Sequence, residues 1–272
     1  MDEKEELTLE QIQEKSFEIL KKIKKIFDEN GWKYYITYGT LIGTIRNHGF
    51  IPWDDDIDIW VPRPDYEKFV KYCIENKEKI KPYELMHYLT NDKYIYPIAR
   101  MSDSRYSINY NLAKEYGLGI FIDIYPIDGV NPKDKIYLKK MKHLIKKVYI
   151  LGNKKYIKSN NVFKNVIKYP YYLIIRNTSL NKLLKKIDKL AQKYEFNNEE
   201  WFECICWSNA QLTYKKAWLG DKEKELFKEF NGELFRVPME YDKLLKKIYG
   251  DYMKLPPEEE RIAHHFYKVY KK

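Results

Sequence analysis

Two neighbouring stretches decide the fold of this chain, namely YGTLIG at residues 38–43 and IPWDDDIDI at residues 51–59. The glycines and a hydroxyl in the first stretch favour a tight turn whose backbone amides can meet an anion. If the second stretch runs into a strand, its period of two places Asp56 and Asp58 on one face and sends Ile57 and Ile59 into a core. Neighbouring carboxylates repel each other unless they share a cation. The pattern therefore predicts an active site for a divalent metal and a phosphorylated substrate.

A third carboxylate lies in a later hydrophobic run, IFIDIYP at residues 120–126. Asp123 is the lone acid in that run, and burial of a carboxylate without a partner is costly. A metal shared with Asp56 and Asp58 would supply the partner. Three carboxylates from two strands are a common arrangement for metal-dependent phosphoryl transfer. We therefore predict Asp56, Asp58 and Asp123 as catalytic residues and metal ligands, with Mg²⁺ or Mn²⁺ as the metal.

Several residues near the first turn are candidates for binding substrate or phosphate. Gly39 and Thr40 precede an expected short helix, and the free amides at a helix start attract phosphate. Arg46 can clamp a phosphate because its guanidinium donates two hydrogen bonds, although a salt bridge is the alternative. His48 follows closely, and Trp53 can line the pocket or stack on a base or a cation. For His48 the ordinary alternative is a surface or core position without a ligand, and for Trp53 it is packing in the core.

Four further polar residues keep two interpretations each. An aspartate-rich stretch is more often a solvated turn when taken alone, so Asp54 and Asp55 can belong to the site or simply form the turn. The metal prediction depends on the glycine turn before this stretch and on Asp123 after it. His264 and His265 can bind phosphate or acceptor, or lie at the surface.

Composition predicts a folded protein without a membrane-spanning segment. The chain has 272 residues, and its hydrophobic content of 44% is enough for a full core. The cysteines are Cys73, Cys204 and Cys206, with no Cys-x-x-Cys pair, which argues against a disulfide framework or a zinc knuckle. The acidic N-terminus is unlike a signal peptide, and no apolar run approaches the roughly 20 residues of a spanning helix. We expect a cytoplasmic protein that can associate peripherally with the inner face of the membrane.

Positive charge is concentrated in one segment. The net charge is +10, yet residues 131–190 contain 17 Lys plus Arg against two acids, or +15, so the remainder carries −5. Three interpretations are open: a solvated helix face, a surface for anionic lipid or a polyanionic glycan, and a nucleic-acid site. No nucleic-acid recognition motif accompanies the charge. We favour a membrane-proximal acceptor surface and expect no nucleic-acid partner.

Hydrophobic periodicity predicts an α+β fold. A capping box of Thr8 and Gln11 begins the first helix, and Asn30-Gly31 ends it. Helices are expected over 7–30, 41–46, 65–80, much of 133–194 with a break at Pro170, and 241–249. Strands are expected over 32–37, 57–61, 83–87, 94–101, 106–110, 119–126, 201–207 and 233–238, with a loop over 251–265. We expect a catalytic core over 1–130, a basic helical region over 131–195 facing the acceptor or membrane, and a C-terminal part over 196–272 that packs back on the core.

Residues 38–59 are similar to the central motif of the LicD family of phosphotransferases. FIDIYP at residues 121–126 and YGDYMKLPP at residues 249–257 are similar to further motifs of that family, so the resemblance spans most of the chain except 133–194. It implies a nucleotidyltransferase-like fold, with a small mixed β-sheet flanked by helices and, here, an appended basic helical region. Family members move phosphocholine from CDP-choline onto sugars of teichoic acid or lipopolysaccharide, and fukutin-type relatives use CDP-ribitol. The resemblance thus implies a CDP-linked donor and a glycan or lipid-linked glycan acceptor at the cell surface.

The reaction implied by this resemblance is attack of an acceptor hydroxyl on the β-phosphorus of the donor, with release of CMP. Asp56 and Asp58 would hold Mg²⁺ against the pyrophosphate. Asp123 would complete the metal site or take the acceptor proton. Two other functions remain open. One is a nucleotidyltransferase that moves NMP from an NTP to a small molecule or RNA, and the other is a non-catalytic basic scaffold at a membrane surface.

Overall fold

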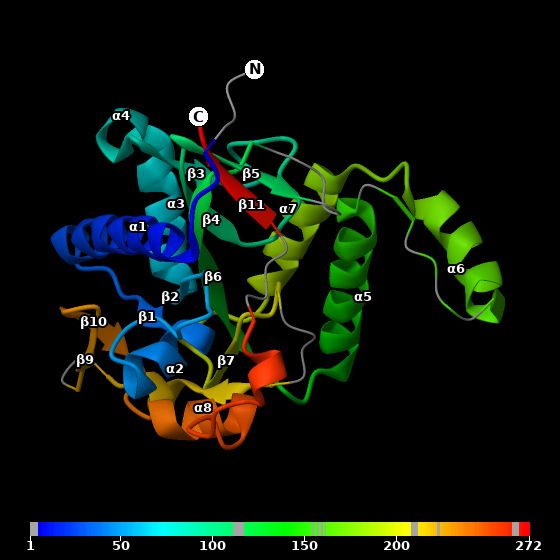
Figure 1. The fold of residues 1–272 in the computed structure, drawn as a ribbon. Helices are drawn as coiled ribbons and strands as arrows, with labels where there is room; N and C mark the ends of the chain where they lie inside the picture. Colours follow the sequence, from blue (N-terminus) through cyan, green and yellow to red (C-terminus); the bar gives the residue numbers. More distant parts are fainter. Residues whose placement is uncertain are drawn as a thin grey trace.

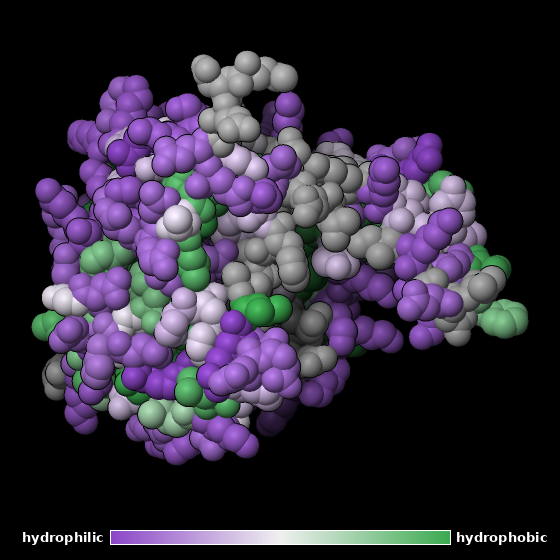
Figure 2. All heavy atoms as spheres, viewed as in Figure 1, coloured by the Kyte–Doolittle hydropathy of each residue, from purple (hydrophilic) through white to green (hydrophobic). Residues whose placement is uncertain are grey.

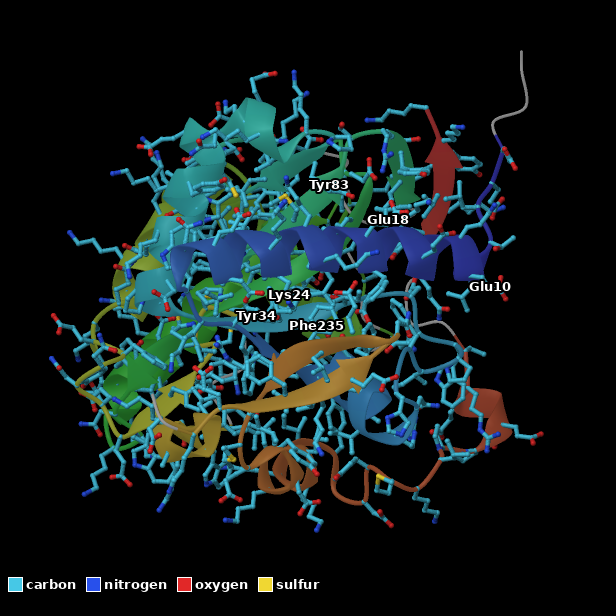
Figure 3. All side chains as sticks on the ribbon, turned by 90° about the vertical axis from the view of Figure 1, so that its left-hand side faces the viewer. Glu10, Glu18, Lys24, Tyr34, Tyr83 and Phe235 are labelled. Carbon is cyan, nitrogen blue, oxygen red and sulfur yellow. The ribbon has the colours of Figure 1, made fainter. Side chains whose placement is uncertain are left out.

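A long amphipathic helix, α1 (Leu9–Asn30), leads the chain into the fold. It begins with the predicted capping box of Thr8 and Gln11 and ends at Gly31, whose φ of 65° suits a residue without a side chain. Figure 3 looks onto this helix, which lies between Tyr83 on one side and Tyr34 and Phe235 on the other. The computed structural model describes residues 5–110, 117–153, 155, 156, 158, 160, 162–207, 212–221, 224–262 and 267–272.

A curled mixed sheet forms the centre of the molecule (Figure 1). Its strands lie in the order β1 (Tyr35–Ile36), β2 (Asp58–Pro62), β6 (Ile120–Val130), β4 (Ala99–Asp103) and β3 (Tyr83–Met86). Strands β2 and β6 are parallel, whereas the other neighbours are antiparallel. The far end of β6 also pairs with β7 (Trp201–Glu203), which pairs with β8 (Tyr214–Lys215). Strands and helices are mixed throughout, which confirms the predicted α+β fold.

Helices flank this sheet, and two small ribbons complete the fold. In Figure 1, α1 lies to the left of β6, with α7 and α5 to its right. Strand β5 pairs with β11, and β9 with β10. The remaining bounds are α2 (Tyr38–Arg46), α3 (Arg63–Glu75), α4 (Lys77–Ile80), β5 (Tyr106–Tyr110), α5 (Lys135–Gly152), α6 (Val162–Ile175), α7 (Leu180–Ala191), η1 (Lys216–Leu219), β9 (Leu226–Phe230), β10 (Glu233–Val237), α8 (Tyr241–Tyr249), η2 (Glu258–Glu260) and β11 (Tyr267–Lys271).

The parallel pair of β2 and β6 brings two predicted acids together. In the register of this pair Asp58 stands opposite Asp123, although the two residues are far apart in the sequence. The isoleucines that alternate with the first acid cluster, Ile57 and Ile59, are both fully buried. The burial expected for Ile57 and Ile59 is therefore confirmed. Strand β2 begins only at Asp58, however, so Asp56 precedes the strand and the expectation that both acids lie on one strand face was wrong.

Several predicted boundaries were wrong. Helix α2 begins at Tyr38, so Gly39 lies in its first turn rather than in a turn before it. The helix expected over 65–80 is divided at Asn76, which caps α3 and precedes α4. Pro170 does not break a helix, because α6 continues through it. On this exposed helix, water can bind the carbonyl whose N–H partner proline lacks.

The bounds of several strands also differ from those predicted. Residues 94–98 lie outside β4, and the strand expected over 201–207 ends at Glu203. Strand β6 runs to Val130, beyond the expected end at residue 126. Strand β11, which pairs with β5, was not predicted. The C-terminal part packs back on the core through β7 and β11, whereas the proposed division into three regions stays a prediction.

Candidate active site

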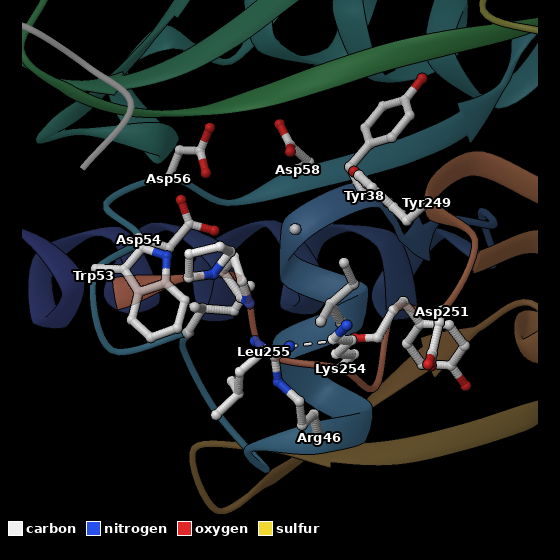
Figure 4. Close-up of a pocket in the computed structure, with 16 residues that line it drawn as sticks. Tyr38, Arg46, Trp53, Asp54, Asp56, Asp58, Tyr249, Asp251, Lys254 and Leu255 are labelled. Carbon is white, nitrogen blue, oxygen red and sulfur yellow. Dashed lines mark hydrogen bonds between the residues drawn. The ribbon is translucent and has the colours of Figure 1, made fainter. Parts of the chain in front are cut away.

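A pocket of about 570 Å³ lies where the two motif stretches meet the C-terminal tail. One wall comes from α2 and the loop that leads to β2, and the opposite wall comes from residues 249–257. Figure 4 shows three carboxylates gathered on one side of this pocket, with Arg46 and Lys254 on the other. The lining residues are Tyr38, Gly39, Ile42, Arg46, Ile51, Trp53, Asp54, Asp56, Asp58, Tyr249, Asp251, Tyr252, Lys254, Leu255, Pro256 and Pro257.

Asp58 is the electrostatic centre of the pocket. Its side chain is buried, and Oδ1 has no hydrogen-bond partner among the described residues. Burial raises the pKa of Asp58 well above its ordinary value, and the negative charges of Asp56, Asp123 and Asp54 raise it further. The side chain of Tyr125 opposes this by a hydrogen bond that lowers the pKa of Asp58. A buried carboxylate oxygen in the field of three other acids is a place where a cation would be stabilised.

Helix α2 positions these acids through two contacts. Thr40 is buried, and its Oγ1 accepts a hydrogen bond from the backbone N–H of Asp58 at 2.8 Å. Gly39 leaves room for the carboxylate of Asp54, because a Cβ at residue 39 would stand 2.7 Å from Asp54 Oδ2. The same loop is tied to α1, since Gln13 Nε2 donates to the carbonyl of Asp54 at 2.7 Å. The first turn of α2 therefore fixes Asp54 and Asp58 beside each other.

Asp123 has a protein partner that the sequence argument did not find. Arg100 Nε donates to Asp123 Oδ1 at 2.5 Å, and Nη2 reaches Oδ2 at 3.3 Å. The guanidinium lies between the rings of Tyr96 and Phe121, with 4.1 Å from Cζ to each centroid. Tyr125 Oη donates to Asp123 Oδ2 at 3.3 Å. The expectation that Asp123 lacks a partner until a metal binds was therefore wrong, while its role as a ligand stays a prediction.

Two cations and an aromatic ring also line the pocket. Arg46 lines the pocket, its Nη1 donates to the carbonyl of Tyr252 at 3.2 Å, and partial burial lowers its pKa. Lys254 faces the same space (Figure 4). Trp53 also lines the pocket, and the guanidinium carbon of Arg261 lies 5.9 Å from its ring centroid. The pocket thus offers cations across from Asp54, Asp56 and Asp58, and an aromatic face beside Asp54 (Figure 4).

The structure brings together most, but not all, of the predicted residues. Thr40 lies behind the pocket wall, and its hydroxyl already binds the Asp58 amide, so its contact with phosphate stays a prediction with a competing partner. His48 is exposed on the turn after α2, outside the pocket lining, and its carbonyl accepts from Asn231 N at 2.9 Å. Asp55 is buried but does not line the pocket. His264 and His265 lie outside the described residues.

Sequence reasoning missed the residues of the second wall. Tyr249, Asp251 and Lys254 belong to the tail motif at residues 249–257, for which the sequence pattern alone predicts no part in the site. The pKa of Tyr249 is raised, first by burial and then by the negative charges of Asp58, Asp54 and Asp56. Arg100 carried no local signal, because its pairing with Asp123 depends on the register of β4 and β6.

The residues of the acidic wall fit a hard divalent cation. The unpartnered Oδ1 of Asp58 is a hard oxygen donor, and Asp54 and Asp56 line the same space. No three His, Cys, Asp or Glu side chains form a ready-made metal site within the described part of the chain. Mg²⁺ in phosphoryl-transfer sites is commonly held by one or two carboxylates together with substrate phosphates. The site therefore suits a cation that arrives with a phosphorylated ligand.

Comparison with known proteins places this architecture in a defined class. Residues 31–158 match a family model described as the nucleotidyltransferase domain of LicD, FKTN and FKRP. The lipopolysaccharide cholinephosphotransferase LicD of Haemophilus influenzae is 30% identical over 249 residues, which cover 88% of this chain and 90% of that protein. An uncharacterized protein of Rickettsia typhi is 31% identical over 126 residues, which cover 46% of this chain and 38% of that protein.

These matches settle the class and then the family. The chain is a phosphotransferase with a nucleotidyltransferase-type core. The chain belongs to the LicD family. The predicted family and the predicted enzyme class are thereby confirmed.

Proposed function

We propose that this enzyme transfers phosphocholine from CDP-choline to a sugar hydroxyl of a cell-surface glycan and releases CMP. The acceptor would be lipopolysaccharide or teichoic acid, or a lipid-linked precursor of either. The observation that carries the proposal is the pocket, in which the acids around Asp58 face Arg46 and Lys254. The name of the Haemophilus relative, a lipopolysaccharide cholinephosphotransferase, supports the same head group and acceptor class.

The donor fits the two chemically different walls. A volume of about 570 Å³ is in the range of pockets that enclose a small ligand. Arg46 and Lys254 would bind the pyrophosphate, because guanidinium and ammonium groups donate charge-assisted hydrogen bonds to phosphate oxygens. Trp53 would stack on the cytosine or on the choline cation. The acids would then lie near the β-phosphorus, where the P–O bond to CMP breaks.

A divalent cation, Mg²⁺ or Mn²⁺, would be held by Asp56 and Asp58, with Asp123 as a further candidate ligand. When bound, it would neutralise the charge that builds on the pyrophosphate oxygens. Thr40 holds the backbone of Asp58, and Arg100 holds Asp123, so both carboxylates are oriented before the donor arrives. The acceptor hydroxyl forms the new O–P bond and gives its proton to a carboxylate, for which Asp123 is the candidate.

Turnover and binding test this proposal together. CMP release should occur with CDP-choline and lipopolysaccharide and should require Mg²⁺. Calorimetry with CDP-choline, CDP-ribitol and CTP should show the tightest binding for CDP-choline. Lys254→Met should raise the KM for the donor about tenfold by removing a charged phosphate contact. Lys243→Met, which changes an exposed lysine on α8 outside the pocket, is the matched control and should leave the KM unchanged.

A second candidate function would be revealed by the same experiments. The matched family model describes a nucleotidyltransferase domain, so NMP transfer from CTP is a concrete alternative. Preference for CTP with release of pyrophosphate would replace the proposed reaction with that one. Binding of none of the three nucleotides would contradict both functions and would favour the non-catalytic scaffold.

A further inference from the structure

Helix α6 carries an apolar face that the described part of the protein leaves uncovered. Phe163, Ile167 and Ile174 are 84%, 76% and 77% exposed. Their spacing of four and seven residues places them on one side of the helix. Val166 and Leu173 extend this stripe and are also exposed, whereas Ile175 is buried. Figure 1 shows α6 projecting beyond α5, away from the sheet, and Figure 2 shows apolar side chains on the outside of this projecting lobe.

The surroundings of this face carry charge of one sign. From Lys135 to Arg176 the sequence contains 12 Lys plus Arg and no Asp or Glu. On α5 the lysines at positions 135, 139, 140, 142 and 146 are exposed, and on α6 so are Lys164 and Lys168. An apolar stripe beside a dense array of lysines is typical of helices that lie in the surface of an anionic membrane.

The dimensions of α6 exclude a spanning role for it. The helix has 14 residues, so it is about 21 Å long, shorter than the roughly 30 Å hydrocarbon core. No described helix is long and apolar enough to cross a membrane. A helix of this length and exposure can lie parallel to the bilayer surface, with its apolar side among the lipid head groups and upper acyl chains.

We propose that α6 is an interfacial helix that docks the enzyme on a membrane rich in anionic lipid. Phe163, Ile167 and Ile174 enter the boundary between head groups and acyl chains, while the lysines of α5 and α6 bind lipid phosphates. A second copy of the chain fits this surface less well, because the two basic arrays would repel each other. A polyanionic glycan would satisfy the lysines but not the isoleucines. The inference goes beyond the proposed transfer reaction and does not depend on it.

Vesicle sedimentation with the full chain tests the proposal. The protein should pellet with phosphatidylcholine vesicles that contain phosphatidylglycerol, and not with phosphatidylcholine alone. Binding should weaken as salt is added, because salt screens the lysine–phosphate attraction. The double variant Ile167→Ser, Ile174→Ser, which keeps the net charge, should bind at least about tenfold more weakly, since burial of even one such side chain contributes about this factor. Leu234→Ser, at a site that is 59% exposed on β10, is the control for loss of an exposed apolar side chain and should bind like the wild type.

The outcomes separate this proposal from its competitors and from the proposed reaction. Unchanged vesicle binding by the isoleucine variant would overturn it, because charge alone would then explain the binding. Light scattering that shows a wild-type dimer, lost in this variant, without any vesicle binding would assign the face to a second copy and also overturn it. CMP release with a soluble acceptor measures the transfer reaction separately, and it should be the same for the wild type and the variant.

Discussion

Asp58 combines the two properties that matter most at the level of single residues. Its backbone is held by Thr40, and its carboxylate is buried among other acids with one oxygen unpartnered among the described residues. Burial of its charge lowers the stability of the free protein, and the proposed cation would offset that cost. This trade-off can be measured, because stability and turnover should respond in opposite directions to one substitution.

Asp58→Asn should abolish most turnover and stabilise the metal-free protein. The loss of a charged contact in the transition state should lower kcat at least about a hundredfold. The folded protein holds the pKa of Asp58 above its unfolded value, so its favourable contribution to stability is present at acid pH and is lost as the pH rises. At about pH 8 the variant should therefore be more stable by at least about 1 kcal/mol, or about 2–4 °C in Tm.

Calorimetric Tm values measured without metal, over a series of pH values, test whether the stability advantage of Asp58→Asn grows as the pH rises. The wild type should lose more stability than Asp58→Asn as the pH is raised from about pH 5 to about pH 8. Parallel Tm profiles would contradict the role of Asp58 as a buried charge. Full CMP release by the variant would contradict its role in catalysis.

Arg100 should be important for stability as well as for the site. Arg100→Met leaves the buried Asp123 unpaired and should cost about 3–5 kcal/mol in the free energy of unfolding. Adding Asp123→Leu should recover most of this loss, because no buried charge then remains. Arg63→Met is the comparison: Arg63 Nε donates to Asp128 Oδ1 at 2.6 Å in another buried pair, away from the pocket lining.

Urea unfolding and calorimetric binding of CDP-choline distinguish the two arginines. Both single variants should lose stability, but only Arg100→Met, measured where both variants are still folded, should also bind the donor more weakly, because Arg100 orients Asp123 opposite Asp58. If Arg100→Met unfolds at the wild-type urea concentration, the ion pair contributes nothing and the structural argument fails.

Among the elements, those governed by local rules were predicted best. Helix α1 follows its capping box and its terminal glycine, and α8 has the predicted bounds of Tyr241–Tyr249. Long-range pairing was predicted less well. β11 is a short polar run whose partner, β5, is distant in the sequence, and periodicity cannot identify such a partner. Local patterns therefore predict the acids of the site, but they cannot predict the pairing of Arg100 with Asp123 or the wall formed by residues 249–257, because both depend on contacts between distant segments.

Pro170 offers a test at the level of one helix. Pro170→Ala should restore a backbone donor inside α6, where proline is about 3 kcal/mol less favourable than alanine. Because α6 projects from the body of the protein, this gain should appear as slower amide exchange over residues 162–175 and not as a higher global Tm. Hydrogen exchange with mass spectrometry measures it. Unchanged exchange in that peptide would mean that the proline does not limit the stability of α6.

At the scale of the whole molecule, the pocket joins segments from opposite ends of the sequence. The acids follow α2, whereas the second wall follows α8, and Arg46 bonds the carbonyl of Tyr252 between them. The central sheet likewise receives β7 from the C-terminal part. The site is therefore a property of the assembled chain rather than of the matched segment over 31–158 alone.

Donor binding should protect both walls at once. Amide exchange over residues 53–58 and over residues 249–257 should slow during a titration with CDP-choline, with the same midpoint for both segments. The hairpin of β9 and β10, outside the pocket, should be unaffected. Protection of the first segment alone would show that the tail takes no part in binding.

The arrangement of the two walls also sets the order in which the enzyme becomes active during its synthesis. Residues 38–58, which contain the acids, leave the ribosome well before Tyr249 to Pro257. A nascent chain that already contains the aspartates still lacks one wall of the pocket. A chain that stops before residue 249 would therefore carry the signature motif without the residues that complete the pocket.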